Sequence, residues 1–251
     1  MAVNQTGRPI RIAVAALAGA CLALAAASVL AAPAPRAKVD APTLTASPTK
    51  GRIKLYRRPC DLASPDDCPS ATLGKRLRAA TYLGAPARFL VLAQADAFGR
   101  GWVRLRLPSR PNDAAGWAPA ELFELREVGT RIEISIRKRL LRFYEDGQLS
   151  TKTRVVVGAP TTPTPRGLFA LYDLYRTRND LRPYVLETTA HSEVLKTFMG
   201  GPGRVAIHGR HGALAAPLGT AVSNGCIRVP DRPLRLIARR AERGTPIVVT
   251  R

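Results

Sequence analysis

The sequence predicts a mostly β protein that carries one short helix near its C-terminus. Short apolar runs separated by turn residues point to strands, and only one later stretch has helical spacing. The clearest strand is at Ile132, Ile134 and Ile136, which alternate with Glu and Ser as a half-buried strand requires. Apolar residues make up 46% of the 251 residues, which argues against disorder of the whole chain.

Residues 1–32 are predicted to be a signal peptide or a membrane anchor. Arg8 and Arg11 precede 21 uncharged residues rich in Ala and Leu, and no acidic residue occurs before Asp40. Cleavage after Ala31, an uncleaved anchor and lipidation at Cys21 are the three alternatives. In each of them the chain is exported to the periplasm, the cell wall or the outer face of the cytoplasmic membrane, because the basic end stays inside.

The charge balance predicts an anionic partner. Lys and Arg number 39 against 18 Asp and Glu, a net charge of +21. Outside the cytoplasmic membrane an anionic cell wall polymer fits this charge better than nucleic acid, and membrane contact is expected only through the N-terminal segment. The sequence also has no glycine-rich phosphate loop, which argues against an ATP or NAD enzyme.

Residues 33–50 are rich in Pro, Ala, Thr and Ser and are predicted to be an extended linker. Residues 51–126 then form a predicted small all-β module, with apolar runs at 53–56, 88–92 and 102–107. Cys60 and Cys68 lie in this module, on either side of a turn. In an oxidising compartment we expect a disulfide between them, with a two-cysteine metal site as the alternative.

Residues 128–251 are predicted to form a second domain. After the isoleucine strand, runs at 140–144 and 151–157 flank a turn at 145–148, which predicts a hairpin. Further predicted elements are a strand at 205–208, a helix built on Leu234, Ile237, Ala238 and Ala241 with Asp231 as N-cap and Gly244 as stop, and a strand at 246–250.

Cys226 is the candidate catalytic residue. One other cysteine lies in the export segment and two are expected to pair, so Cys226 remains as a thiol in an oxidising compartment. It follows Ser223, Asn224 and Gly225, and a glycine allows positive φ or close approach of a substrate. The neighbouring amides can then point at a developing oxyanion, and Arg228 can favour the thiolate or hold a substrate carboxylate.

His208 is the candidate base. It lies 18 residues before Cys226, and glycines and a proline between them allow the chain to turn back. An adjacent imidazole lowers a thiol pKa and gives a nucleophile for acyl transfer through a thioester. Each residue alone is more often a packing or surface residue, so the two together carry the hypothesis.

These residues resemble a known family. Ile207-His208-Gly209 followed by Ser223-Asn224-Gly225-Cys226-Ile227-Arg228 is similar to the signature of the L,D-transpeptidases with a YkuD-type catalytic domain. The threonine-proline run at 162–169, Ala190-His191-Ser192 and Gly244-Thr245-Pro246 also resemble family positions, over about residues 129–250. Separately, residues 102–119 resemble bacterial SH3-like domains of envelope enzymes, which implies a small SH3-like barrel over residues 51–126.

The resemblance implies a role for each matched residue. Cys226 corresponds to the nucleophile, His208 to the base, and the Gly209 carbonyl to the group that orients the imidazole. The amides of Gly225 and Cys226 correspond to the oxyanion hole. Ser223, Asn224 and Arg228 are assigned to substrate binding, although the family often has His where Asn224 stands.

The resemblance further implies a β-sandwich that needs no cofactor or metal. It implies attack on a peptidoglycan stem peptide, release of D-Ala, and transfer of the acyl group to an amine of another stem or of an envelope protein. Two alternatives remain at this point: a Cys–His envelope peptidase whose acceptor is water, and a wall-binding protein with a degenerate site. A metal at His208 and His211 is not expected, because no acidic or cysteine partner is near. His191 is expected to be structural or cleft-lining, and Tyr172, Tyr175 and Tyr184 are more simply packing residues than walls of a groove.

Overall fold

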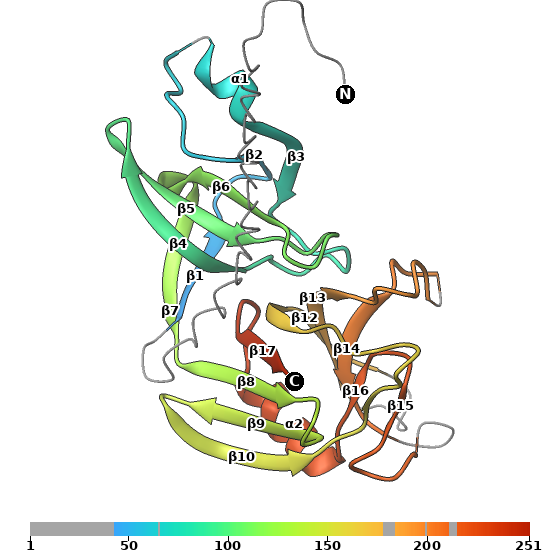
Figure 1. Cartoon of the computed structure of the whole chain (residues 1–251). Helices are drawn as coiled ribbons and strands as arrows, with labels where there is room; N and C mark the ends of the chain where they lie inside the picture. Colours follow the sequence, from blue (N-terminus) through green and yellow to red (C-terminus); the bar gives the residue numbers. More distant parts are fainter. Residues whose placement is uncertain (1–42, 65, 178–183, 199, 211–214) are drawn as a thin grey trace, which may run out of the picture. The chain divides into compact units, whose positions relative to one another are not determined.

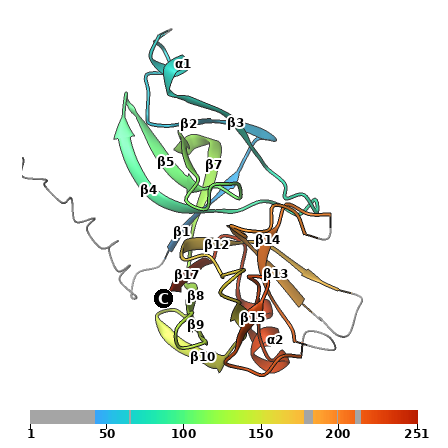
Figure 2. The same cartoon turned by 45° about the vertical axis from the view of Figure 1, so that its right-hand side comes forward.

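The computed structural model describes residues 43–64, 66–177, 184–198, 200–210 and 215–251, and within them two large β-sheets (Figures 1 and 2). The prediction of a mostly β protein is confirmed. The N-terminal sheet has the strand order β3-β2-β6-β5-β4-β1-β7. Its strands are β1 (Thr43–Pro48), β2 (Arg52–Tyr56), β3 (Thr72–Arg78), β4 (Phe89–Ala97), β5 (Arg100–Arg106), β6 (Ala115–Pro119) and β7 (Phe123–Val128).

The N-terminal sheet encloses its own apolar core because its strands alternate between the two faces. Ile53 and Leu55 on β2 and Val103 and Leu105 on β5 are buried in one cluster. The expected disulfide between Cys60 and Cys68 is present. It lies in a smaller apolar cluster that includes Tyr56 and Trp102, beside the short helix α1 (Asp67–Ala71).

The prediction of a linker over residues 33–50 is wrong for its second half. Residues 43–48 form β1, which pairs with β4 on one side and β7 on the other. The Pro, Thr and Ser content suggested a linker, but threonine favours strands and Thr45 and Ala46 are buried between the two neighbours. Tertiary pairing therefore decides the structure of this segment.

The C-terminal sheet has eight strands in the order β10-β9-β8-β17-β12-β13-β14-β16, and β11 pairs separately with β15. Its strands are β8 (Thr130–Ser135), β9 (Leu140–Glu145), β10 (Gln148–Arg154), β12 (Gly167–Arg176), β13 (Tyr184–His191), β14 (Arg204–His208), β16 (Ile227–Arg228) and β17 (Pro246–Thr250). The small pair is β11 (Val157–Gly158) with β15 (Ala221–Ser223). The isoleucine strand and the closing strand pair with each other in parallel, Ile132 opposite Ile247.

The helix α2 (Asp231–Arg240) packs inside the curl of the C-terminal sheet. Its buried residues Leu234, Ile237 and Ala238 belong to the same core as residues of β8, β9, β12 and β14. Figures 1 and 2 show β8–β10 on one flank and β13–β14 on the other, with α2 between them. The N-cap is Pro230 rather than the predicted Asp231, which is the first helical residue and places its carboxylate in the first turn.

The hairpin prediction is confirmed. β9 and β10 are antiparallel neighbours, and the turn between them holds Asp146 and Gly147 at φ 47° and 78°. Two consecutive positive φ angles match the twist of a tight hairpin.

The predicted export segment, residues 1–32, lies outside the described residues. Among the helices that the structure describes, none combines the length and the apolar character needed to cross a bilayer.

Candidate active site

Cys226 lies on a tight loop between β15 and β16. The loop runs through Asn224 and Gly225, and Gly225 has φ 109°, a conformation that L side chains rarely adopt. The glycine therefore allows the chain to reverse directly before the cysteine. Cys226 is partly exposed and is not disulfide-bonded.

Buried hydroxyl groups hold this loop in place. Ser223 Oγ donates to the Cys226 carbonyl at 2.6 Å and accepts from the Gly225 N–H at 3.2 Å. Thr164 Oγ1 donates to the Gly225 carbonyl at 2.8 Å and accepts from the Gly158 N–H at 2.9 Å. Hydrogen bonds within the protein thus fix the loop before any substrate contact.

The structure places Ser223 differently from the expectation of a substrate contact. The residue is 1% exposed, and both its donor and its acceptor capacity serve the loop. Its side chain therefore stabilises the conformation of the cysteine loop by bonding two of its backbone groups. Neither Asn224, which is exposed, nor Arg228 lines the cavity beside Cys226.

His208 ends β14 with its imidazole oriented by the next residue. Its Nδ1 lies 2.7 Å from the Gly209 carbonyl oxygen. A carbonyl oxygen can only accept, so Nδ1 carries the proton of the neutral ring and Nε2 keeps the basic lone pair. This contact is the one that the resemblance implies for Gly209.

The pairing of β14 with β16 brings His208 and Cys226 to the same cavity. β14 and β16 pair in parallel with Ile207 opposite Ile227, and the Ala206 N–H lies 3.5 Å from Cys226 Sγ. His208 and Cys226 line one cavity of about 840 Å³. An N–H directed at sulfur favours the thiolate over the thiol, as hydrogen bonds to a charged form do.

The neighbouring strand β13 supplies part of the cavity wall. Val185 lies opposite His208 and Glu187 opposite Ala206, so the four side chains share one face of the sheet. All four line the cavity. Residues from outside β13 and β14 complete the wall: Tyr82, Tyr172, Tyr175, Thr177, Phe198, Gly200, Gly201, Pro202 and Cys226.

The expectation of packing holds for Tyr184, which packs against the core of the C-terminal sheet, and for Tyr172, which is buried in an apolar cluster and also lines the cavity. Tyr175 instead lines the cavity. Tyr82, Glu187 and Arg204 were not singled out from the sequence at all. None of them lies near Cys226 in the chain or in a recognisable motif, so no local signal marks them.

His191 is buried at the end of β13, with 3% of its surface exposed. Burial, together with the nearby Arg204 and Arg110 guanidinium groups, lowers its pKa from 6.5 to about 4. The ring is therefore neutral at neutral pH. It does not line the cavity, and His211 lies outside the described residues.

The loop between β5 and β6 contacts the segment that leads from β13 to β14. Arg110 donates to three carbonyls of this segment, those of Ser192 at 2.6 Å, Leu195 at 3.0 Å and Pro202 at 3.2 Å. Asn112 also pairs with the His191 backbone, donating to its carbonyl at 2.9 Å and accepting from its amide at 2.8 Å. Phe198 of the cavity wall lies within the segment held in this way.

A thiol and an oriented imidazole that line one cavity are the groups that cysteine acyl transfer requires. Residues 129–249 match the model of the YkuD family, the L,D-transpeptidase catalytic domain. This match spans the C-terminal sheet with its helix, which therefore resembles a YkuD-type L,D-transpeptidase catalytic domain.

Individual proteins resemble the same region. A curated protein of Bacillus licheniformis that carries the provisional name L,D-transpeptidase YkuD is 31% identical over 120 residues, 48% of this chain and 65% of that protein. The chain thus covers less than two thirds of the length of that protein.

Two solved structures are also similar. The NMR structure of the catalytic domain from the E. faecium L,D-transpeptidase is 25% identical and covers 48% of this chain and 95% of its own, with TM-score 0.35. A crystal structure of an L,D-transpeptidase from Mycobacterium tuberculosis H37Rv is 16% identical and covers 64% and 98%, with TM-score 0.43.

Proposed function

We propose that the protein is an exported L,D-transpeptidase that acts on peptidoglycan stem peptides in cell wall cross-linking or remodelling. The observation that carries the proposal is the shared cavity of Cys226 and His208 inside the matched catalytic domain. The imidazole orientation and the backbone N–H on sulfur support the same assignment.

In the first half-reaction Cys226 forms a thioester with the donor stem. His208 Nε2 takes the thiol proton, and the thiolate attacks the carbonyl carbon of the diamino acid that precedes the terminal D-Ala. The tetrahedral intermediate collapses with cleavage of the C–N bond. His208 returns the proton to the departing amine, so D-Ala leaves as a neutral amine and the imidazole is regenerated.

In the second half-reaction an acceptor amine attacks the thioester carbonyl. His208 removes a proton from the amine as the new C–N bond forms, and the C–S bond breaks. The thiolate then recovers its proton from His208. The acceptor is an amine of a neighbouring stem or of an envelope protein.

Backbone amides of the cysteine loop would stabilise the oxyanion in both steps. One such donor is typically worth about 2.7–4 kcal/mol of transition-state stabilisation. We assign this role to the Cys226 and Gly225 N–H groups. Because the Gly225 N–H also lies 3.2 Å from Ser223 Oγ, it would share its proton between two acceptors.

The proposal is tested by incubating the full-length purified protein with muropeptides and analysing the products by mass spectrometry. We expect loss of D-Ala and cross-linked dimers, and neither product with Cys226→Ala. Full activity in the Cys226→Ala variant would overturn the enzymatic proposal.

The same experiment separates the alternatives. Free tripeptide stems without cross-links would identify a peptidase whose acceptor is water. An inert Cys226 thiol, measured by the rate of iodoacetamide labelling, together with retention on isolated sacculi would identify a wall-binding protein.

We also propose that the basic surface holds the protein on an anionic wall polymer. The net charge of +21 supports this, and the last helix presents Arg235, Arg239 and Arg240 on its outer side. Retention on isolated sacculi should fall steeply as salt is raised, because screening weakens such contacts. Salt-independent retention would contradict this proposal.

A further inference from the structure

A residue of the N-terminal sheet region reaches the catalytic cavity. Tyr82 lies between β3 and β4, far in sequence from the catalytic domain, and its side chain lines the cavity that holds His208 and Cys226. The residue is 56% exposed, so it is not a core residue of its own sheet. Its position therefore needs an explanation other than packing within the N-terminal module.

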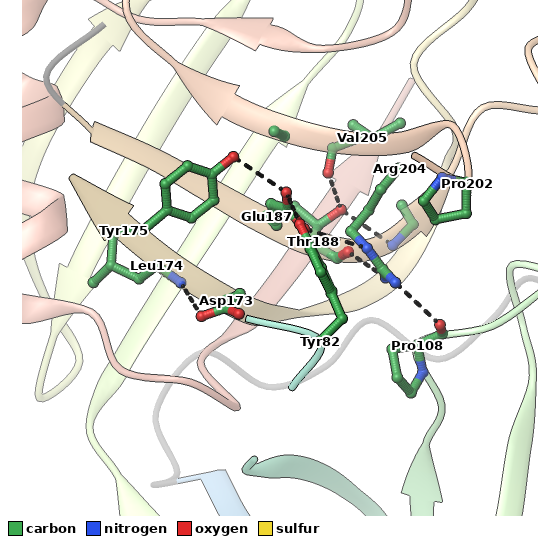
Figure 3. A network of polar contacts seen from close by, with 12 residues as sticks. Tyr82, Pro108, Asp173, Leu174, Tyr175, Glu187, Thr188, Pro202, Arg204 and Val205 are labelled. Atoms are coloured by element: carbon green, nitrogen blue, oxygen red, sulfur yellow. Dashed lines mark hydrogen bonds and ion pairs between the residues drawn. The ribbon is translucent and has the colours of Figure 1, made fainter. Parts of the chain in front are cut away.

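A hydrogen bond ties Tyr82 to the cavity wall. Its hydroxyl donates to Glu187 Oε1, the oxygen that Tyr175 also approaches at 3.3 Å (Figure 3). Burial and this hydrogen bond raise the Tyr82 pKa, so the phenol stays protonated as a donor at neutral pH. Glu187 lies on β13 opposite Ala206 of β14, and the Ala206 amide contacts Cys226 Sγ. The hydrogen bond to Glu187 therefore holds Tyr82 near the strand that contacts the cysteine.

The ring of Tyr82 is also stacked. It lies nearly parallel to the Tyr172 ring, with centroids 6.4 Å apart and an interplanar angle of 23°. The Arg204 guanidinium covers Tyr172 at 4.6 Å from the ring centroid. Two aromatic rings, one from the turn between β3 and β4 and one from β12, therefore form one continuous wall, a geometry that favours apolar and peptide groups of a ligand.

Charges in this wall are compensated within the protein. Arg204 Nε lies 3.4 Å from Glu187 Oε2, and the guanidinium also donates to the carbonyls of Thr188 at 3.2 Å and Pro108 at 3.4 Å. Glu187 thus has an ionic partner and two phenol donors. The aromatic surface left for a ligand is the exposed ring of Tyr82 rather than an open charge, because Tyr172 is buried against Tyr82 and Arg204.

We propose that Tyr82 is a substrate-positioning residue, through which the N-terminal module forms part of the binding site for the donor stem peptide. The identity of that ligand rests on the proposed function. The cavity volume of about 840 Å³ lies within the range of sites that hold small ligands. Tyr82 does not touch the reacting atoms, so it should affect binding of the donor more than the chemical step.

The test compares Tyr82→Ala and Tyr82→Phe in the full chain, with D-Ala release measured over a range of donor tetrapeptide concentrations. Loss of the ring should raise KM about tenfold, the effect of 1.4 kcal/mol, with kcat changed less than about threefold. Tyr82→Phe keeps the ring and loses only the hydrogen bond, so KM should rise by a smaller factor. An unchanged KM in Tyr82→Ala would overturn the proposal.

Two matched controls lie outside the cavity. Tyr144 donates to Glu133 at 3.1 Å in a similar tyrosine–glutamate pair, so Tyr144→Phe removes the same bond elsewhere on the C-terminal sheet. Leu83 is the exposed neighbour of Tyr82 and does not line the cavity, so Leu83→Ala tests the loop itself. Both controls should keep wild-type KM and kcat.

A second readout needs no turnover. Tyr82→Ala should accelerate labelling of Cys226 by a bulky maleimide severalfold and leave the rate with small iodoacetamide unchanged, because the wall is opened. If the wild-type protein releases no D-Ala from any stem peptide, the proposed function fails. The ratio of the two labelling rates then still decides whether Tyr82 walls the cavity, and an unchanged ratio overturns that.

Discussion

The two sides of the catalytic cavity are built in different ways. On the cysteine side, short hydroxyl side chains bond backbone groups of a loop, all within residues 158–228, and Ser223 and Thr164 are almost fully buried. On the tyrosine side, long side chains from the turn between β3 and β4 and from the C-terminal sheet meet at Glu187. The first arrangement holds the Cys226 loop to a narrow range of positions. The second builds a wall from several side chains, each of which can be removed by a separate substitution.

The largest expected effect is on the cysteine side, at the base. His208→Gln should lower the rate of D-Ala release by about 10²–10⁴-fold, the usual contribution of a general acid–base residue. KM for the donor should change little. The rate of iodoacetamide labelling of Cys226 should fall at neutral pH in the same variant. Near wild-type turnover would remove His208 from the mechanism.

The next largest effect is expected on the free energy of unfolding, and it comes from the buried His191 at the end of β13. His191 has a folded pKa of about 4 against 6.5 unfolded, so the unfolded state binds more protons between these values. Stability should be complete above pH 6.5 and fall by about 3 kcal/mol as pH falls towards 4. Urea unfolding at several pH values measures this.

His191→Gln supplies the control for that experiment, because glutamine does not titrate. Carboxylates titrate in both proteins, so the difference between wild type and variant isolates the histidine. A difference that does not depend on pH between 4 and 6.5 would contradict a buried neutral imidazole.

A smaller effect tests the hydroxyl bonds of the cysteine loop. Thr164→Val keeps the shape but leaves the Gly158 N–H and the Gly225 carbonyl without this partner. We expect a loss of about 1–3 kcal/mol in the free energy of unfolding, together with a lower kcat. Thr164→Ser retains the hydroxyl and should recover most of both. Equal effects of Val and Ser would mean that packing, not hydrogen bonding, matters here.

The smallest effect is expected on the tyrosine side. Tyr175 approaches Glu187 at 3.3 Å, and Glu187 keeps Tyr82 and Arg204 when that hydroxyl is lost. Tyr175→Phe should therefore cost about 1 kcal/mol or less in donor binding, read as a rise in KM. A larger effect than that of Tyr82→Phe would reverse our ranking of the two tyrosines.

The same contrast explains what could be predicted from the sequence. His208, Gly209, Gly225 and Cys226 lie in short motifs whose chemistry depends on neighbours in the chain. The hairpin, the closing strand and the disulfide are also local, and they were predicted correctly. Local patterns therefore pointed to Cys226 and His208, which the structure places at one cavity.

The opposite wall depends on contacts that no local pattern encodes. Tyr82 and Glu187 are 105 residues apart, and only the packing of the two sheets brings them together. β1 was missed for a related reason, since its pairing with β4 and β7 outweighs a linker-like composition. The SH3-like character of residues 51–126 stays a prediction.

Through Arg110, the segment between β13 and β14 depends on the N-terminal module for hydrogen-bond donors. One guanidinium from the N-terminal sheet satisfies three carbonyls of the segment that carries Phe198. Exchanging the N-terminal module for an unrelated one would withdraw those donors and leave the segment to find new partners or water. Exchange of such modules during evolution, or in the laboratory, should therefore succeed only when the new module supplies equivalent hydrogen-bond donors to these carbonyls.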